Sequence, residues 1–439
     1  MRKPIKKVSV VGLGYIGLPT AAMFASRKIE VVGVDVNPKT VETINRGEIH
    51  IIEPDLDMVV SAAVSQGYLR ATLDPEPADA FLIAVPTPFK GPDHEPDLSY
   101  IEAASKAIAP VLEPGNIVVL ESTSPVGATE AMADWLAEAR SDLRFPQDAG
   151  EDADIRIAHC PERVLPGKVM QELITNDRVI GGMTRRCSLT AAALYKQFVT
   201  GDCVIASGPR AAEMAKLTEN SFRDVNIAFA NELSLICDEL GIDVWELIVL
   251  ANRHPRVNIL QPGPGVGGHC IAVDPWFIVS SAPDKSPLIQ AARGVNASKP
   301  DWVIEQVKSA LGTHLAANPA KTASEVRIAV YGLAFKPDID DLRESPALEI
   351  ATTLKAWHAG TLIVVEPYIE ELPPALEGAQ LSKRSTGIEA DIHVMLVDHR
   401  DFKGSARPTG EIIDARGVWA ETPQLYSFVE RRAAARAEQ

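Results

Sequence analysis

The sequence predicts an α/β protein in which two doubly wound parallel-sheet domains are joined by a central helical region with a long connecting helix. Three observations lead to this fold class. A strand, a glycine turn and a helix follow one another in residues 7–27, and the same design recurs from Val326. Between them, residues 211–240 have helical spacing of apolar side chains and no glycine or proline. We expect three domains, the first and last of the Rossmann-like type, at residues 1–208, 209–311 and 312–439.

The composition is that of a soluble globular protein. The chain has 439 residues, of which 46% are hydrophobic and 23% charged, and it is too long for one ordinary core. No stretch is long and apolar enough to cross a bilayer, and residues 1–7 lead directly into a strand pattern, so we expect a cytoplasmic protein without a membrane partner. The net charge of −16 argues against nucleic-acid binding. The five cysteines lack a CxxC pair, which argues against a disulfide framework and a metal site.

The first glycine turn has the spacing of a dinucleotide-binding site. A strand pattern ends in the motif GxGxxG, formed by Gly12, Gly14 and Gly17, and a second strand pattern ends at Asp35. Glycines allow a pyrophosphate to approach the helix N-terminus, and Asp35 would accept hydrogen bonds from ribose hydroxyls. A carboxylate there repels a 2′-phosphate, which favours NAD over NADP. The alternative is a glycine turn that only packs a helix on a strand.

Polar and proline-bearing turns follow the other strands of the first domain. The expected strands span residues 7–12, 30–35, 80–85, 116–121 and 154–159. The last three are followed by Pro86-Thr87, by Ser122-Thr123 and by Cys160-Pro161-Glu162. Because ligands of parallel sheets bind beyond the carboxyl ends of the strands, we expect these turns to line one crevice. Ordinary turns with capping hydroxyls are the alternative.

The central region and the last domain follow. A long helix between two α/β regions commonly forms a subunit interface, so we expect a homodimer through residues 211–240, although packing within the chain is the alternative. Helical spacing resumes at residues 286–311 with a boundary at Pro300, and we expect an exposed linker at residues 312–324. The last domain lacks the other two glycines of the motif, so we expect no second dinucleotide. Its expected strands span residues 326–331, 361–366, 392–397 and 411–414.

The stretch from Gly263 to Trp276 carries four glycines before Cys270 and an Asp-Pro pair after it. Glycines let backbone and ligand approach closely, and Asp274-Pro275 has the pattern of a helix start. A thiol there can act as a nucleophile, although a lone cysteine is more often a buried structural thiol. Together with a nicotinamide cofactor, the thiol permits oxidation of an alcohol through an aldehyde and a thioester to a carboxylate, with two NAD per turnover.

Motifs along nearly the whole chain resemble the UDP-glucose/GDP-mannose dehydrogenase family. They are VGLGYIGLP from Val11, AVPTP from Ala84, ESTSPVG from Glu121, CPERVLPG from Cys160, EMAKLTEN from Glu213, HPR at residues 254–256, the Cys270 loop, FKPD from Phe335 and LRES from Leu342. The resemblance implies an NAD-dependent four-electron dehydrogenase that oxidises a UDP-sugar at C6. It implies an NAD site formed by Gly12, Gly14, Tyr15, Ile16, Gly17, Asp35, Pro86, Thr87 and Thr123.

The resemblance also implies the catalytic residues. Cys270 would attack the C6 aldehyde to form a thiohemiacetal and then a thioester. Lys216 and Asn220 would stabilise the developing oxyanion. Asp274 and Thr123 would organise the proton-accepting water, and Glu162 would assist thioester hydrolysis as a general base. The alternatives are a surface pair of Lys216 with Glu219, a helix cap for Asp274 and a plain loop carboxylate for Glu162.

For the substrate, the resemblance implies a UDP-N-acetylhexosamine. The chain departs from the glucose branch in the residues after Glu162 and in having Val273, not lysine, before Asp274. These departures favour UDP-N-acetyl-D-mannosamine, with a uronate product for bacterial surface polysaccharide, over UDP-N-acetylglucosamine or UDP-glucose. A non-catalytic nucleotide-sugar sensor is the alternative of a different class, and the intact catalytic set argues against it. The implied substrate contacts are Arg163, Val164, Lys216, Asn220, Arg256 (in some members supplied across the subunit interface), Gly267, Lys336 and Arg343.

Overall fold

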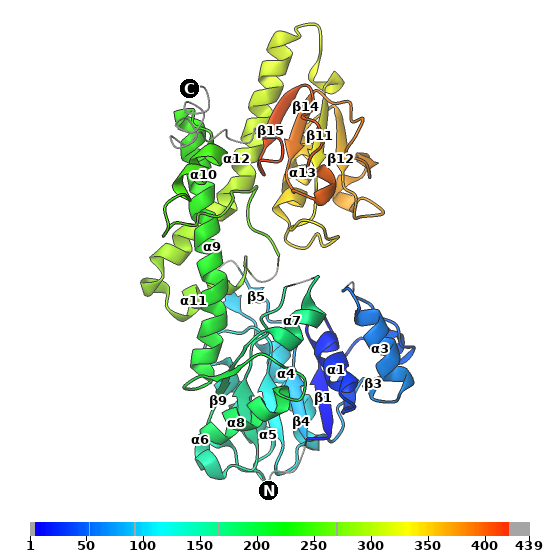
Figure 1. Cartoon of the computed structure of the whole chain (residues 1–439), viewed down its shortest axis with the longest axis vertical. Helices are drawn as coiled ribbons and strands as arrows, with labels where there is room; N and C mark the ends of the chain where they lie inside the picture. The colour runs from blue at the N-terminus through cyan, green and yellow to red at the C-terminus, as the bar shows by residue number, and fades with distance from the viewer. Residues whose placement is uncertain (1–4, 52, 92–93, 166, 269–270, 421–439) are drawn as a thin grey trace, which may run out of the picture. The chain divides into compact units, whose positions relative to one another are not determined.

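A computed structural model describes residues 5–51, 53–91, 94–165, 167–268 and 271–420 (Figure 1). The chain divides into two compact units. The N-terminal unit comprises Met1–Asn220 and Val273–Ser286, and the C-terminal unit comprises Ser221–Ala272 and Pro287–Gln439. The long helix α9, Pro209–Leu240, begins in the first unit and continues in the second.

The N-terminal unit is built on a sheet of eight strands within the described residues, in the order β10-β9-β8-β7-β4-β1-β2-β3. All neighbours are parallel except β8 and β9. The strands are β1 Lys7–Val11, β2 Glu30–Val34, β3 Leu69–Thr72, β4 Ala80–Ile83, β7 Ile117–Leu120, β8 Arg156–His159, β9 Arg178–Gly182 and β10 Cys203–Ile205, and a short hairpin adds β5 Phe89–Lys90 and β6 Glu95–Pro96. The helices are α1 Gly17–Ser26, α2 Pro38–Asn45, α3 Leu56–Ser65, α4 Ser99–Ile108, α5 Ala128–Ala139, α6 Pro146–Ala149, α7 Val169–Thr175, α8 Arg185–Tyr195 and α11 Asp274–Ser281.

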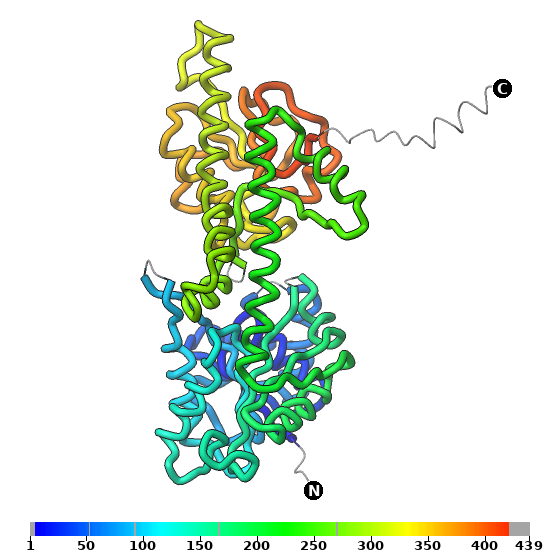
Figure 2. Tube along the Cα trace, turned by 90° about the vertical axis from the view of Figure 1, so that its left-hand side faces the viewer, coloured from blue at the N-terminus to red at the C-terminus, as the bar shows by residue number. Residues whose placement is uncertain are grey.

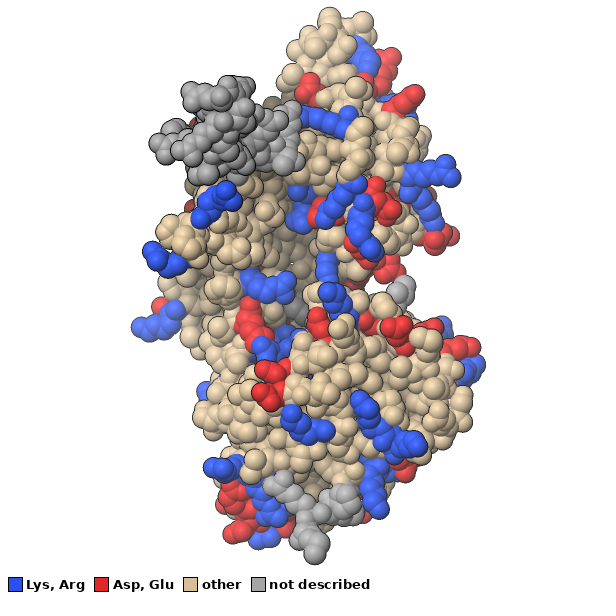
Figure 3. Space-filling model, viewed as in Figure 1, with Lys and Arg blue, Asp and Glu red and all other residues tan. Residues whose placement is uncertain are grey.

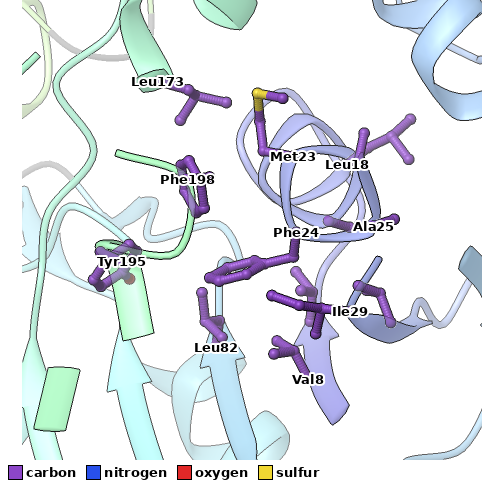
Figure 4. Packing of buried hydrophobic residues seen from close by; sticks show 14 of the residues in the cluster. Val8, Leu18, Met23, Phe24, Ala25, Ile29, Leu82, Leu173, Tyr195 and Phe198 are labelled. Atoms are coloured by element: carbon purple, nitrogen blue, oxygen red, sulfur yellow. The ribbon is translucent and has the colours of Figure 1, made fainter. Parts of the chain in front are cut away.

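Helices cover both faces of this sheet, because successive strand residues point to opposite sides. In β4, Leu82 belongs to the hydrophobic cluster under α1 and α8, whereas Phe81 and Ile83 belong to the cluster under α4 and α5. Figure 4 shows the first cluster, where Phe24 of α1 points toward Leu82 and Phe198. The rings of Phe24 and Phe198 meet edge to face with centroids 4.7 Å apart.

The C-terminal unit contains a parallel sheet whose described strands are ordered β13-β12-β11-β14-β15. The strands are β11 Arg327–Tyr331, β12 Thr361–Val365, β13 Gln380–Ser382, β14 Ile392–Met395 and β15 Glu411–Asp414. Helices α12, Pro287–Ala317, and α13, Pro346–Trp357, pack on one face, and Tyr331, Phe402 and Trp419 cluster on the other. Helix α10, Val244–Ala251, follows α9, and within this unit α9 and α12 lie side by side (Figure 2).

The predicted fold class is confirmed, and two predicted boundaries, the helix boundary at Pro300 and the start of the linker at Gly312, are wrong. Helix α12 continues through Pro300 and ends at Ala317, so the linker expected from Gly312 is helical in its first part. A proline inside a helix costs ~3 kcal/mol. Pro300 and its neighbours Asn296 and Val303 are buried, and this packing offsets the cost. Among the described residues, no helix has the length and apolar character needed to cross a membrane.

Candidate active site

In the first glycine turn, the two outer glycines are closely packed against the backbone, whereas the middle glycine has open space beside it. A Cβ on Gly12, whose φ is +89°, would lie 2.5 Å from the carbonyl oxygen of Ala84, and a Cβ on Gly17 would lie 1.8 Å from that of Gly12. A Cβ on Gly14 would meet nothing within 4 Å. The outer glycines therefore let the strand, turn and helix pack closely, and Gly14 leaves room for a phosphate group to approach the backbone.

Asp35 follows β2 with both carboxylate oxygens held in place. Oδ2 accepts a hydrogen bond from the backbone amide of Leu13 at 3.0 Å, and Oδ1 accepts one from Asn37 at 2.9 Å. The side chain is partly exposed, so its remaining lone pairs can accept hydrogen bonds from a ribose. The open turn and this fixed carboxylate fit NAD.

The turns after β4 and β7 are joined by hydroxyl groups. The Thr87 hydroxyl donates to the carbonyl oxygen of Thr123 at 2.5 Å, and the Ser122 hydroxyl donates to that of Val85 at 2.7 Å. Two turns that lie 36 residues apart in the sequence thus form one wall at the carboxyl ends of neighbouring strands.

Asn220 of α9 and Asp274 at the start of α11 form a buried pair. The Asn220 side-chain amide donates to Oδ2 of Asp274 at 2.5 Å, and Asp274 is 2% exposed. Burial raises the pKa of Asp274 to about 7, against the opposing effects of the Asn220 hydrogen bond and the Lys216 charge. Lys216 lies one helical turn before Asn220 on the same face of α9. A carboxyl group in this setting can take up or release a proton near neutral pH.

Glu162 is held by a residue that sequence analysis missed. Its Oε2 accepts from the guanidinium of Arg178 at 2.5 Å, and its Oε1 accepts from the backbone amide of Arg163 at 2.5 Å. Arg178 is 2% exposed and lies at the start of β9. An arginine in a buried strand is itself a signal, because a buried charge requires a partner, but the sequence does not indicate which carboxylate it meets.

Arg163 and Val164, two of the implied substrate-binding residues, lie in a loop that is anchored from two sides. Arg163 forms a two-point ion pair with Glu219 of α9, with N–O distances of 2.7 and 3.1 Å, and Glu219 has a partner other than Lys216. Val164 packs partly buried against the hydrophobic core. Glu53, which is also buried and was not expected here, accepts from the backbone amides of Gly167 and Val169 at 2.9 and 2.8 Å.

The C-terminal unit contains a pocket beside the glycine loop. Gly265 lines it together with Phe335, Pro337, Pro346, Asp398 and Arg416 among other residues. A Cβ on Gly267 would lie 2.2 Å from the carbonyl oxygen of Glu344, so this loop needs glycine to pack where it does. Arg416, which sequence analysis also missed, is paired with Asp398 at 2.5 Å.

The remaining implied residues are placed as follows. Lys336 is half-buried in the loop between two lining residues of this pocket. Arg343 is exposed and paired with Asp341 at 2.6 Å, and Arg256 is exposed. Cys270 lies outside the described residues. Among the described residues, no cluster of His, Cys, Asp and Glu is suited to a metal ion.

Sequence models of one family match three consecutive segments of the chain. The NAD binding domain of the UDP-glucose/GDP-mannose dehydrogenase family matches residues 6–199, the central domain residues 210–298, and the UDP binding domain residues 329–421. The chain belongs to the UDP-glucose/GDP-mannose dehydrogenase family. It is therefore an NAD-dependent nucleotide-sugar dehydrogenase with a UDP binding domain, and the predicted family and cofactor are confirmed.

Relatives within the family are similar over nearly their whole length. The UDP-N-acetyl-D-mannosamine dehydrogenase of Yersinia pestis is 67% identical over 94% of this chain and 99% of its own, and that of Escherichia coli K12 is 64% identical over the same shares. An NDP-N-acetyl-D-galactosaminuronic acid dehydrogenase of Ralstonia solanacearum is 62% identical over 94% of this chain and 96% of its own. Among solved structures, the UDP-D-ManNAc dehydrogenase of Pyrococcus horikoshii has a TM-score of 0.81 at 39% identity, over 96% of this chain and 97% of its own.

Proposed function

We propose that this protein oxidises UDP-N-acetyl-D-mannosamine at C6 to UDP-N-acetyl-D-mannosaminuronate. The observation that carries the chemistry is the buried Asn220–Asp274 pair, because it supplies a carboxyl group that exchanges a proton near neutral pH four residues after Cys270 in the chain. The choice of sugar is supported by relatives of 64–67% identity that carry this activity in their names.

Each catalytic side chain has a role in this reaction. Lys216 and Asn220 supply a cation and an amide donor to the C6 oxygen as it gains charge, and Asp274, with a water positioned by Thr123, takes up the proton of the hydroxyl. The Cys270 thiolate then adds to C6 of the aldehyde to give a thiohemiacetal, whose oxidation gives a thioester. NAD, when bound, would accept one hydride in each of the two oxidations, so one sugar alcohol, one water and two NAD⁺ would give one uronate, two NADH and three protons.

Glu162 is proposed to act in the last step, hydrolysis of the thioester. Each of its oxygens already accepts one hydrogen bond, and each retains a lone pair toward a water molecule. The buried guanidinium of Arg178 forms an ion pair with the Glu162 carboxylate at 2.5 Å and holds it in place. In this form Glu162 can withdraw a proton from the water that attacks the thioester carbon, releasing the Cys270 thiol.

We also propose the predicted organisation of the chain, with an NAD-binding domain at residues 1–208, a central domain at 209–311 and a UDP-sugar-binding domain at 312–439. The part of α9 that lies in the C-terminal unit, residues 221–240, carries four exposed large apolar side chains, Phe222, Phe229, Ile236 and Leu240, which are 68, 54, 45 and 63% exposed in the single chain. The first three are spaced by seven residues and share a helix face. We propose that this face forms a homodimer, with Arg256 reaching the substrate of the partner subunit, in a cytoplasmic enzyme that serves bacterial surface-polysaccharide synthesis.

The experiment that tests the function is a comparison of kcat/KM on UDP-N-acetyl-D-mannosamine, UDP-N-acetylglucosamine and UDP-glucose, with NADH counted per uronate formed. The proposal predicts the highest value for the first sugar and two NADH per product. UDP-N-acetylgalactosamine belongs in the same comparison, because relatives of 61–62% identity are named NDP-N-acetyl-D-galactosaminuronic acid dehydrogenases. One NADH per product, or no turnover of any of the four sugars, would rule out the proposed reaction.

Charge on the molecular surface is consistent with a small-molecule substrate. On the face shown in Figure 3, acidic and basic side chains are interspersed and do not gather into a single basic patch. The net charge of −16 means that a diphosphate must be held by particular local cations. The implied contacts Lys336 and Arg343 and the pocket residue Arg416 are such cations in the C-terminal unit.

A further inference from the structure

The C-terminal unit repeats the carboxylate arrangement that the N-terminal unit has at Asp35. Glu366 directly follows β12, and its two oxygens accept from the backbone amides of Leu333 and Tyr368 at 2.7 and 3.1 Å. Gly332, in the turn after β11, has a φ of +88°. The strand, glycine turn and fixed carboxylate that are expected to hold a ribose in one domain are therefore also present in the other.

In this second copy the carboxylate faces a histidine. Nε2 of His399 lies 3.1 Å from Oε2 of Glu366, and both side chains are 0% exposed. Nδ1 of His399 accepts from the backbone amide of Asp338 at 2.9 Å, which places the ring proton on Nε2, where it is donated to Glu366. The rings of Tyr368 and Phe402 pack against the imidazole with centroids 4.9 and 5.2 Å away. A ribose cannot reach this carboxylate, so the arrangement serves another purpose.

His399 joins the two loops that line the pocket of this unit. The lining residues Phe335 and Pro337 lie in the loop just before Asp338, and the backbone amide of Asp338 donates a hydrogen bond to His399. The lining residues at 396–398 immediately precede His399 itself. The Glu366 carboxylate fixes the other side of the imidazole to the end of β12. One buried side chain thus sets the separation of both pocket walls.

We propose that His399, paired with Glu366, is a positioning residue for the nucleotide of the substrate. It holds the Phe335–Asp338 loop, with Lys336 in it, against the 396–398 loop so that the pocket is formed before the ligand arrives, which lowers the entropic cost of binding. This proposal rests on the proposed function, because it assumes that the pocket of the UDP binding domain receives the nucleotide part of the sugar substrate.

The test compares His399→Gln with His358→Gln. His358 is a matched control, because it is buried in the same unit, bonds to the carbonyl oxygen of Val326 at 2.8 Å and does not line the pocket. Glutamine can form one of the two hydrogen bonds that His399 makes, but it cannot reach both the Asp338 amide and the Glu366 carboxylate at once. The expected result for His399→Gln is a rise of about tenfold or more in the Kd for UDP and in the KM for the sugar nucleotide, with kcat and the KM for NAD changed less than about twofold. His358→Gln should leave all four values near those of the unaltered enzyme.

Two further measurements keep the test decisive. His399→Asn can still accept from the Asp338 amide, so its UDP affinity should fall between those of the unaltered protein and His399→Gln. The proposal is overturned if UDP binds equally well to His399→Gln and His358→Gln, or if His399→Gln loses UDP and NAD affinity together with a lower Tm, which would indicate a structural role alone. An unaltered enzyme that neither binds UDP nor oxidises any of the sugar nucleotides would instead contradict the proposed function.

Discussion

At the scale of single residues, two buried carboxyl groups of the N-terminal unit differ in what surrounds them. Asp274 meets an amide and is 2% exposed, and burial raises its pKa to about 7. Glu162 forms an ion pair with the guanidinium of Arg178 at 2.5 Å, which fixes the position of its carboxylate. These surroundings fit the proposed roles, in which Asp274 exchanges a proton during each turnover and a positioned Glu162 assists thioester hydrolysis.

The proposed role of Asp274 predicts a pH dependence of the reaction. The carboxyl group must be deprotonated to take up the proton of the substrate hydroxyl, so kcat/KM should fall about tenfold per pH unit below about pH 7. Asp274→Asn should remove this acidic limb and lower kcat by roughly 10²–10⁴-fold. Steady-state NADH formation between pH 5 and pH 9 measures both effects.

Stability provides an independent check on the same group. A raised pKa means that the folded state binds more protons than the unfolded state between the ordinary Asp pKa of about 3.9 and about pH 7, so this group lowers the free energy of unfolding as the pH rises through that window. Asp274→Asn has no carboxyl group that loses a proton in this window. Its free energy of unfolding should therefore increase relative to that of the unaltered protein as the pH rises from 4 to 8. A difference in Tm that is independent of pH would contradict the assignment.

The proposed role of Cys270 as the nucleophile can be tested by substitution. Cys270→Ser should abolish uronate formation, because a serine hydroxyl is far less ionised than a thiol and a poor nucleophile without a dedicated base. NAD binding should be little changed, since the expected NAD site lies at the first glycine turn. Product analysis and fluorescence titration with NAD measure the two effects, and unchanged turnover would refute the role of the thiol.

At the scale of elements, a buried polar network ties α9 and α12 to the glycine loop. Asn296 and Arg293 of α12 donate to Oδ1 of Asp224 at 2.8 and 2.7 Å, and Asn231 donates to Asn296 at 2.8 Å. Asn231 in turn accepts from the backbone amide of Gly263 at 2.8 Å. The position of the loop that leads to Cys270 is thus fixed by two helices, through groups that burial makes costly to leave unpaired.

This network predicts the effect of Asn231→Ala. The substitution leaves Gly263 N–H and the Asn296 side-chain oxygen without this partner, and each such buried group costs ~1–3 kcal/mol. We expect the free energy of unfolding to fall by about 2–4 kcal/mol in urea denaturation. Asn226→Ala on the same helix is the control, because Asn226 bonds to Phe222 of its own helix. Equal effects of the two substitutions would show that the network contributes nothing of its own.

Elements also show how far local patterns predict structure. The glycine turn, β2 and Asp35 are contiguous in sequence, so spacing alone predicted their arrangement. Helix α12 continues through Pro300 although proline normally ends a helix, because burial against the rest of the unit outweighs the local preference. The edge strands β3, β10 and β13 are three or four residues long and have no distinctive pattern, so they were not predicted.

At the scale of the whole molecule, the exposed face of α9 leads to a prediction about assembly. Phe229→Asp should place a charge in the centre of the proposed interface and convert the dimer to a monomer, because an unpaired charge is costly to bury. Light scattering after gel filtration measures the mass. Leu288→Asp is the control, since Leu288 is 68% exposed, compared with 54% for Phe229, but lies on α12. A protein that stays dimeric with Phe229→Asp would show that the interface lies elsewhere.

The fold class, the family, the cofactor and the candidate residues within continuous motifs were all predicted from the amino-acid sequence. These features depend on neighbours within a few positions of one another, and physical spacing rules act on such neighbours directly. Which charged side chains pair with one another is seen only in the three-dimensional structure. Arg178 meets Glu162 across 16 residues, His399 meets Glu366 across 33, and Arg416 meets Asp398 across 18. A buried charge needs a counterpart, but which of many charged side chains supplies it depends on the path of the chain through both sheets.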